Sequence, residues 1–105
     1  NMSYIIILSN TNSMDSAETI ANFLVKEKLA ACVNIVPKII SIYSWKNQIE
    51  KEEEFLLLIK SRKELFDQIK EKITMLHPYE VPEIISFDIE NGSENYLDWI
   101  RTCTI

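Results

Sequence analysis

Apolar residues recur along the chain with two different periods, and the change of period divides it into strands and helices. Runs that suit strands lie at Tyr4–Leu8, residues 38–46, residues 50–61 and Pro82–Ile89. Residues 29–36 also have strand composition. Helical spacing follows residue 13, in Ala17, Ile20, Ala21, Leu24 and Val25, and follows residue 64, in Leu65, Phe66, Ile69, Ile73 and Leu76.

Cap residues mark where these helices begin and end. Asn12 or Ser13 can accept hydrogen bonds from the free amides of the first helix. Residues 61–64, Ser-Arg-Lys-Glu, match a capping box in front of the second helix. Pro78 ends that helix, because proline cannot continue it. The turn at residues 91–93 precedes a short C-terminal helix.

The order of these elements is β-α-β-β-α-β followed by a short helix. Two β-α-β halves joined through a hairpin are typical of the ferredoxin-like fold. We therefore expect one α+β domain over residues 1–105, with an antiparallel sheet and both main helices on one face.

The central hairpin looks too long for the rest of the sheet. Strands over residues 38–46 and 50–61 would extend roughly 30 Å or more, about twice the length of Tyr4–Leu8. Pro37 fits an edge, a bulge or a strand start, and Asn47 fits a turn position with positive φ. The overhanging part carries large apolar residues: Ile40, Ile42, Tyr43, Trp45, Phe55 and Leu57.

Such a tip should not face water as one patch, so it needs a cover. Coverage by the C-terminal helix of the same chain is one solution. A closed homo-oligomer is the favoured one, because it would also cover the strand edges. Its expected interface contains Ile42, Tyr43, Trp45 and Phe55.

Composition narrows the class of protein. The 105 residues are 47% hydrophobic with a net charge of −5, and no apolar run is long enough to span a membrane. The acidic balance argues against nucleic-acid binding, and a single glycine, Gly92, excludes Gly-rich phosphate loops. The N-terminal residues lack a signal-peptide pattern, and Cys32 and Cys103 form no C-x-x-C motif. These features favour a cytoplasmic protein with reduced thiols, and Cys32 is expected to be a small buried side chain.

Several motifs together resemble the CutA family of divalent-cation tolerance proteins. They are "AACVNI", Tyr43-x-Trp45, Glu54 and Lys60 on one strand, "HPYEVPEI" and "YLDW". The resemblance covers Tyr4 to Ile100. It implies a ferredoxin-like homotrimer built by the long hairpins, an assembly similar to the PII signalling proteins, and a link to metal tolerance without an established enzyme reaction.

The resemblance does not carry a copper site with it. Bacterial relatives with proposed copper ligands have a cysteine at the end of the first strand and two adjacent histidines before Pro-Tyr. Here these positions hold Ser9, Leu76 and His77. Copper favours sulfur and imidazole donors, and only one of the three remains.

Five polar residues in the motifs are the candidate ligand pocket: Glu54, Lys60, His77, Tyr79 and Glu80. Glu54 and Lys60 share a strand face but lie about 20 Å apart along it, so they form no contact pair. A trimer could bring Lys60 of one chain near His77 or Glu80 of another and form a pocket for an anion or a small molecule.

Each candidate also has a structural interpretation. His77 is the candidate ligand for a divalent metal ion, but a histidine that ends a helix is favoured. Glu50, Glu52, Glu53 and Glu54 could bind Ca²⁺ or Mg²⁺, although Glu53 points away from its neighbours and a charged strand edge is more common.

The sequence favours a non-enzymatic trimer that binds a metal ion or a small ligand between subunits. The alternatives are a PII-like small-molecule sensor and an enzyme with an inter-subunit site. Against an enzyme, no nucleophile and base occur at a recognisable spacing. The patterns of RNA-binding sheets and metallochaperones are absent.

Overall fold

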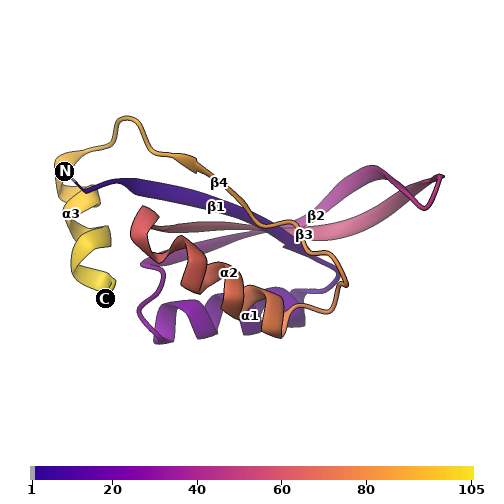
Figure 1. The fold of residues 1–105 in the computed structure, drawn as a ribbon, viewed down its shortest axis with the longest axis horizontal. Coiled ribbons are helices and arrows are strands. Elements are labelled where there is room, and N and C mark those ends of the chain that lie inside the picture. Colours follow the sequence, from indigo (N-terminus) through magenta and orange to yellow (C-terminus); the bar gives the residue numbers. More distant parts are fainter. Residues whose placement is uncertain (1) are drawn as a thin grey trace.

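The computed structural model describes residues 2–105 as a four-stranded antiparallel sheet with two helices on one face and a third at one end (Figure 1). The elements are β1 (Tyr4–Thr11), α1 (Met14–Lys26), β2 (Cys32–Trp45), β3 (Gln48–Arg62), a 3₁₀ turn (Lys63–Leu65), α2 (Phe66–Leu76), β4 (Ile85–Asp88) and α3 (Glu94–Cys103). The strand order is β2-β3-β1-β4. The expected α+β, ferredoxin-like fold is confirmed.

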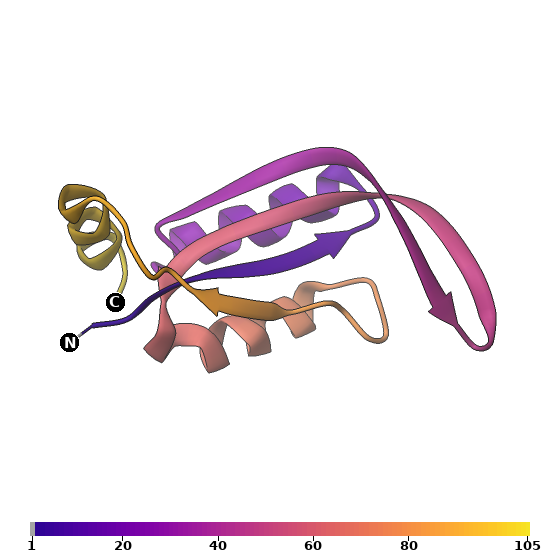
Figure 2. The ribbon, with the colours of Figure 1, turned by 90° about the horizontal axis from the view of Figure 1, so that it is seen from above.

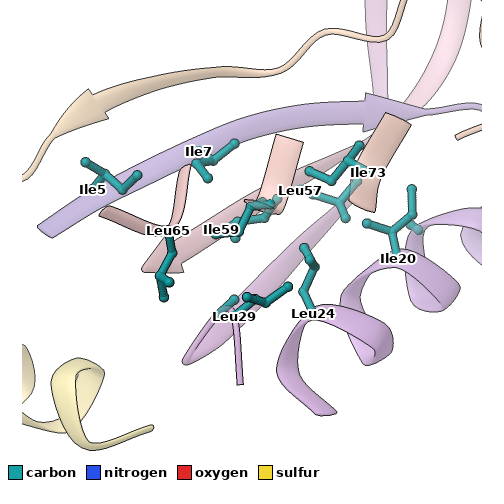
Figure 3. Close-up of a cluster of buried hydrophobic side chains, with 12 residues drawn as sticks. Ile5, Ile7, Ile20, Leu24, Leu29, Leu57, Ile59, Leu65 and Ile73 are labelled. Carbon is teal, nitrogen blue, oxygen red and sulfur yellow. The ribbon is translucent and has the colours of Figure 1, made fainter. Parts of the chain in front are cut away.

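The core lies between the sheet and the pair α1 and α2 (Figure 3). Alternate residues of β1, and of β3 from Leu57 to Ser61, face the helices, so every second side chain in these stretches is buried. The buried aliphatic side chains include Ile5, Ile7, Ile20, Leu24, Leu57, Ile59, Ile69 and Ile73. Each contributes about 1.5–3 kcal/mol of hydrophobic free energy, which makes this layer the rigid base of the molecule.

The two helix starts differ from each other. Ser13 caps α1 as expected, and its Oγ accepts a hydrogen bond from the Ser16 amide at 3.0 Å. The capping box predicted over residues 61–64 is wrong. Ser61 still belongs to β3, and its hydroxyl donates to the buried Leu29 carbonyl at 2.5 Å instead.

The hairpin of β2 and β3 extends well beyond the end of β1 (Figure 2). β1 pairs with β3 only as far as Thr11 opposite Phe55, which leaves residues 48–54 without a neighbour on that side. Lys46 and Asn47 form the two-residue turn with φ of 50° and 65°, as expected for Asn47. The overhang gives the molecule its long axis of 44 Å.

A one-residue bulge interrupts β2 at Pro37 and Lys38, as the proline suggested. Val36 lies opposite Leu56 and Ile39 opposite Glu54, so three steps on β2 match two on β3. Lys38 takes a φ of 60°. The bulge reverses which face the odd-numbered residues of β2 point to, so Tyr43 shares a face with Glu50, Glu52 and Glu54.

The C-terminal helix does not cover the hairpin. α3 lies at the opposite end of the sheet from the tip (Figures 1 and 2), so the single-chain cover considered above is wrong. There its end is held by Arg62, whose Nε donates to Thr104 Oγ1 at 2.8 Å. Ile42 therefore stays 68% exposed at the tip. Phe55 and Leu57 instead belong to the main core, because they lie beside β1.

Two strands differ in length from the prediction. β1 reaches Thr11, because Ser9 and Thr11 continue the buried alternation with hydroxyl side chains. β4 is only four residues long, because residues 82–84 belong to the connection that leaves α2. Among residues 2–105, no helix is long and apolar enough to cross a membrane.

Candidate functional site

An open groove of about 720 Å³ lies between the hairpin and the connection from α2 to β4. The hairpin supplies one wall and residues 79–83 of the connection supply the other. The end of β1 lies between them. The lining residues are Asn10, Asn12, Ser41, Ile42, Tyr43, Trp45, Glu52, Glu54, Tyr79, Glu80, Val81 and Glu83.

The groove unites three of the five predicted pocket residues. Glu54, Tyr79 and Glu80 line it, together with Tyr43 and Trp45, which were expected at a subunit interface. The aromatic pair reaches the groove because the bulge in β2 turns it to the face of Glu54.

Glu54 and Tyr79 form the closest polar contact of the groove. The Tyr79 hydroxyl donates to Glu54 Oε2 at 2.5 Å, and only 4% of Glu54 is exposed. Burial, followed by the hydrogen bond to Glu54 and the negative charge of that carboxylate, raises the pKa of Tyr79 well above 10. The phenol therefore keeps its proton and remains a donor to Glu54.

His77 lies next to the groove with both ring nitrogens engaged. Nδ1 accepts a hydrogen bond from the Tyr79 amide at 3.1 Å, so the ring proton lies on Nε2, which donates to the Asn10 carbonyl at 2.6 Å. The ring also packs edge-on against Tyr79, with centroids 4.7 Å apart. His77 directly follows α2 and ties the connection to β1, and in this arrangement neither nitrogen offers a lone pair to a metal.

Lys60 lies apart from the groove, nearer the other end of β3. It is opposite Cys32 in the sheet, and its Nζ donates to Asn34 Oδ1. One chain therefore does not place Lys60 beside His77 or Glu80. Cys32 is half-buried and unbridged at this position, rather than buried as expected.

Several groove residues did not stand out in the sequence. Asn10 and Asn12 lie where β1 ends, and the Asn10 side-chain amide donates to Glu83 Oε1 at 3.3 Å. Ser41 lies opposite Glu52 on the hairpin. Strand parity links Glu52 to Glu54, but no sequence pattern shows that the connection folds back on β1.

Within residues 2–105, no three His, Cys, Asp or Glu side chains converge in a way that could hold a metal ion. Ser9, which stands where some relatives have a proposed copper ligand, is fully buried on the core face of β1. Leu76 has no donor atom, and His77 is committed to Asn10 and Tyr79. These three positions therefore do not fit a copper site.

Comparisons with known proteins agree with the fold and the motifs. Residues 5–103 match the family of the CutA1 divalent ion tolerance protein. The divalent-cation tolerance protein CutA of Thermus thermophilus is 46% identical over 99 residues, covering 94% of this chain and 96% of that protein. The chloroplastic protein CutA of Arabidopsis thaliana is 40% identical over 100 residues, covering 95% of this chain and 55% of that protein.

A solved structure shares the architecture over the full length. The periplasmic divalent cation tolerance protein CutA from Archaeoglobus fulgidus has a TM-score of 0.93 and 38% identity, over 95% of this chain and 97% of that one. The chain spans about half of the plant relative but nearly all of the two prokaryotic ones. With 99 residues of one family matched and this fold, the chain belongs to the CutA1 divalent ion tolerance protein family.

Proposed function

We propose that this chain acts as a homotrimer without enzymatic activity and contributes to divalent-ion tolerance by binding a metal ion or a small ligand between its subunits. Divalent-ion tolerance is the property for which its family is named. The assembly and the ligand site are inferred from the surface of the single chain.

The observation that carries the proposal is the apolar face of the sheet opposite α1 and α2. It combines half-buried side chains of the central strands with exposed side chains of the edge strands. From β1, β3, β2 and β4, it contains Ile6, Leu8, Leu56, Leu58, Val36, Ile85 and Phe87. Ile85 and Phe87 are each 52% exposed, and a patch of this kind is typical of a surface that binds another protein.

The overhanging hairpin gives a second reason for assembly. Residues 48–54 of β3 have free backbone groups on the side that β1 leaves uncovered. Exposed strand edges readily pair with another chain, and Ile42 and Ile49 at the tip are 68% and 77% exposed. A closed ring of three copies would cover hairpin and sheet face together.

The groove chemistry supports a binding role over a catalytic one. A general base needs an available lone pair within reach of the substrate, and the one histidine uses its lone pair on the Tyr79 amide. The carboxylates can bind a ligand, but no three converge for a metal among the described residues. A metal ion would therefore need donors from a second subunit.

Sedimentation or light scattering of the pure chain tests the assembly. The expected mass is three times that of the 12.3 kDa chain. Phe87→Lys places a charge on the apolar sheet face and should yield monomers. Ser86→Lys, the neighbouring substitution that points to the other face, should leave the trimer intact. A wild-type monomer at all concentrations would overturn the assembly.

Calorimetric titration with Zn²⁺, Cu²⁺ and Ca²⁺ tests the position of the ligand site. Binding that disappears in Phe87→Lys and remains in Ser86→Lys is expected for a site between subunits. Equal affinity in both variants would place the site within one chain and contradict this part of the proposal.

The cellular location is also part of the proposal. We propose the cytoplasm, where the two unbridged thiols would stay reduced, although the relatives above include proteins named for the chloroplast and the periplasm. Fractionation of the source cells with an antibody against the chain tests it.

A further inference from the structure

The connection from β4 to α3 contains the one glycine of the chain, and an asparagine precedes it. Asn91 and Gly92 are both exposed and belong to no helix or strand. They lie at the end of the sheet opposite the hairpin tip (Figures 1 and 2). Asparagine is a thermolabile residue, because its side-chain amide can react with the backbone nitrogen of the next residue. The pair is therefore a candidate site of spontaneous covalent change.

The reacting groups of Asn91 and Gly92 are not held by hydrogen bonds. Within residues 2–105, the Gly92 amide donates to no carbonyl or side chain, and the Asn91 side chain has no partner. The chain is fixed just before them, where the Ile89 amide donates to the Tyr4 carbonyl at 2.8 Å, and just after them by α3. A short unpaired segment of this kind rearranges at little cost in free energy.

Glycine at position 92 has a packing role that also exposes its nitrogen. A Cβ there would lie 3.1 Å from Leu97 Cδ2, so α3 packs directly on the bare backbone. The same lack of a side chain removes the group that would shield the Gly92 nitrogen from the Asn91 side chain. Packing alone explains why glycine stands here, and the reactivity follows from it.

Every other asparagine among residues 2–105 lacks one of these features. Asn10 and Asn34 lie in paired strands, and a side-chain partner engages each of them. The remaining asparagines precede residues whose side chains shield the backbone nitrogen. These pairs are Asn12-Ser13, Asn22-Phe23, Asn47-Gln48 and Asn95-Tyr96. Asn91 is therefore expected to react first.

We propose that Asn91 deamidates spontaneously through a cyclic imide with Gly92. The Gly92 nitrogen loses its proton to hydroxide and bonds to Asn91 Cγ, while the bond from Cγ to Nδ2 breaks and Nδ2 leaves as ammonia. Water then opens the imide at either carbonyl and produces aspartate or isoaspartate at position 91. The reaction consumes one water and releases one ammonia, and it needs no oxidant, metal or enzyme.

The two products should affect α3 in opposite ways. Ser93 stands at the N-terminus of α3, and its side chain forms no capping hydrogen bond. An aspartate two residues earlier adds a negative charge near the positive end of the helix, which is favourable. Isoaspartate instead lengthens the main chain by one methylene group and displaces Gly92 from Leu97. This inference goes beyond the proposed function and depends on neither the trimer nor a ligand.

Incubation of the pure chain in mildly alkaline buffer tests the proposal. The tryptic peptide of residues 73–101 contains Asn91 and Asn95, and its fragmentation assigns a change from amide to acid to one of them. Ion exchange separates the product, because its net charge is one unit more negative than −5. We expect conversion at Asn91 in the folded chain, partly to isoaspartate, while Asn12 and Asn95 stay amides. An Asn91 that reacts no faster than Asn12 and Asn95 would overturn the proposal.

Matched variants test the mechanism. Asn91→Gln leaves the packing of Gly92 unchanged and should abolish the acidic product, because the larger imide ring closes far less readily. Gly92→Ala should slow the conversion severalfold, since its Cβ shields the nitrogen. Asn95→Gln makes the same change as Asn91→Gln four residues later and should leave the rate unchanged.

Two results from these variants would contradict the site. The same acidic product from Asn91→Gln would mean that another residue reacts. An unchanged rate in Gly92→Ala would mean that the missing side chain does not control the reaction. Amide hydrogen exchange in α3 is measured on the separated products, and it should be faster in the isoaspartate form than in the aspartate form. Equal exchange in both would refute the predicted effect on α3.

Discussion

Removal of the Ser9 hydroxyl should stabilise the protein. Ser9 is fully buried on the core face of β1, and its Oγ is the one buried side-chain nitrogen or oxygen among residues 2–105 without a hydrogen-bond partner. An unsatisfied buried polar group costs about 1–3 kcal/mol, whereas Ser9→Ala removes only one oxygen atom of packing. We expect a gain of about 1 kcal/mol in the free energy of unfolding.

Thr11→Val is the matched control on the same strand and face. Thr11 is equally buried, but its Oγ1 is hydrogen-bonded to Ser16 Oγ at 2.7 Å. Its replacement removes a satisfied hydroxyl and leaves Ser16 without this partner, so Thr11→Val should destabilise by about 1 kcal/mol. Opposite signs at two neighbouring buried hydroxyls are the specific expectation.

Thermal and urea unfolding at one fixed protein concentration measure both changes. A gain of about 1 kcal/mol corresponds to a rise in Tm of roughly 4–8 °C for a domain of this size. The concentration is held constant because the proposed assembly would add to the measured stability. Loss of stability in Ser9→Ala comparable to that in Thr11→Val would refute the reasoning, since it would mean that the Ser9 hydroxyl has a partner.

Three further changes test the groove, the turn and the C-terminal anchor. Tyr79 has a raised pKa, so above pH 10 the native state keeps the phenol proton while the unfolded state releases it. The free energy of unfolding of wild type, relative to that of Tyr79→Phe, should therefore be constant below pH 10 and fall above it by at most about 1.4 kcal/mol per pH unit. In urea unfolding at alkaline pH, a difference that grows with pH would contradict the contact with Glu54. Asn47→Gly should stabilise the hairpin by up to about 1 kcal/mol, because φ is 65° there, and a loss in thermal unfolding would show that the Asn47 side chain contributes more than the turn geometry. Arg62→Met should lower the free energy of unfolding by about 2 kcal/mol and speed amide hydrogen exchange in α3, because the hydrogen bond from Arg62 Nε to Thr104 is lost. Unchanged exchange rates in α3 would show that this bond does not hold the helix.

The sequence predicts most of the fold because the buried positions follow strict periods. Ile5 and Ile7 alternate on a strand, and Ile69 and Ile73 repeat at helical spacing, so element type and order follow from pattern alone. Ends are less predictable. Ser61 resembles a helix cap, yet its hydroxyl satisfies the Leu29 carbonyl, which is 32 residues away in the chain. Local spacing cannot show that a tertiary contact takes precedence.

The groove is predictable only in part for a related reason. Strand parity places Glu54 and Glu52 on one face, and the motifs single out Tyr79 and Glu80. Their meeting depends on the connection after α2, which His77 fastens to the Asn10 carbonyl. Lys60 shares parity with Glu54 but lies toward the other end of β3, as their spacing in the sequence predicted, so it does not reach the groove of its own chain.

The bulge at Pro37 and Lys38 has a consequence for comparing and redesigning proteins of this shape. Alternation in β2 is out of phase before and after it, so Val33 faces α1 and α2 while Tyr43 faces away from them. Deleting Lys38 would remove the bulge but keep Tyr43 opposite Glu50 on its present face. Absorbing Lys38 into regular pairing without a deletion would instead slip the register by one residue and turn Tyr43 and Trp45 to the opposite side of the hairpin. In an alignment with a protein that lacks the bulge, a single-residue gap at this point therefore keeps the faces of the outer strand matched, and leaving the gap out would exchange them.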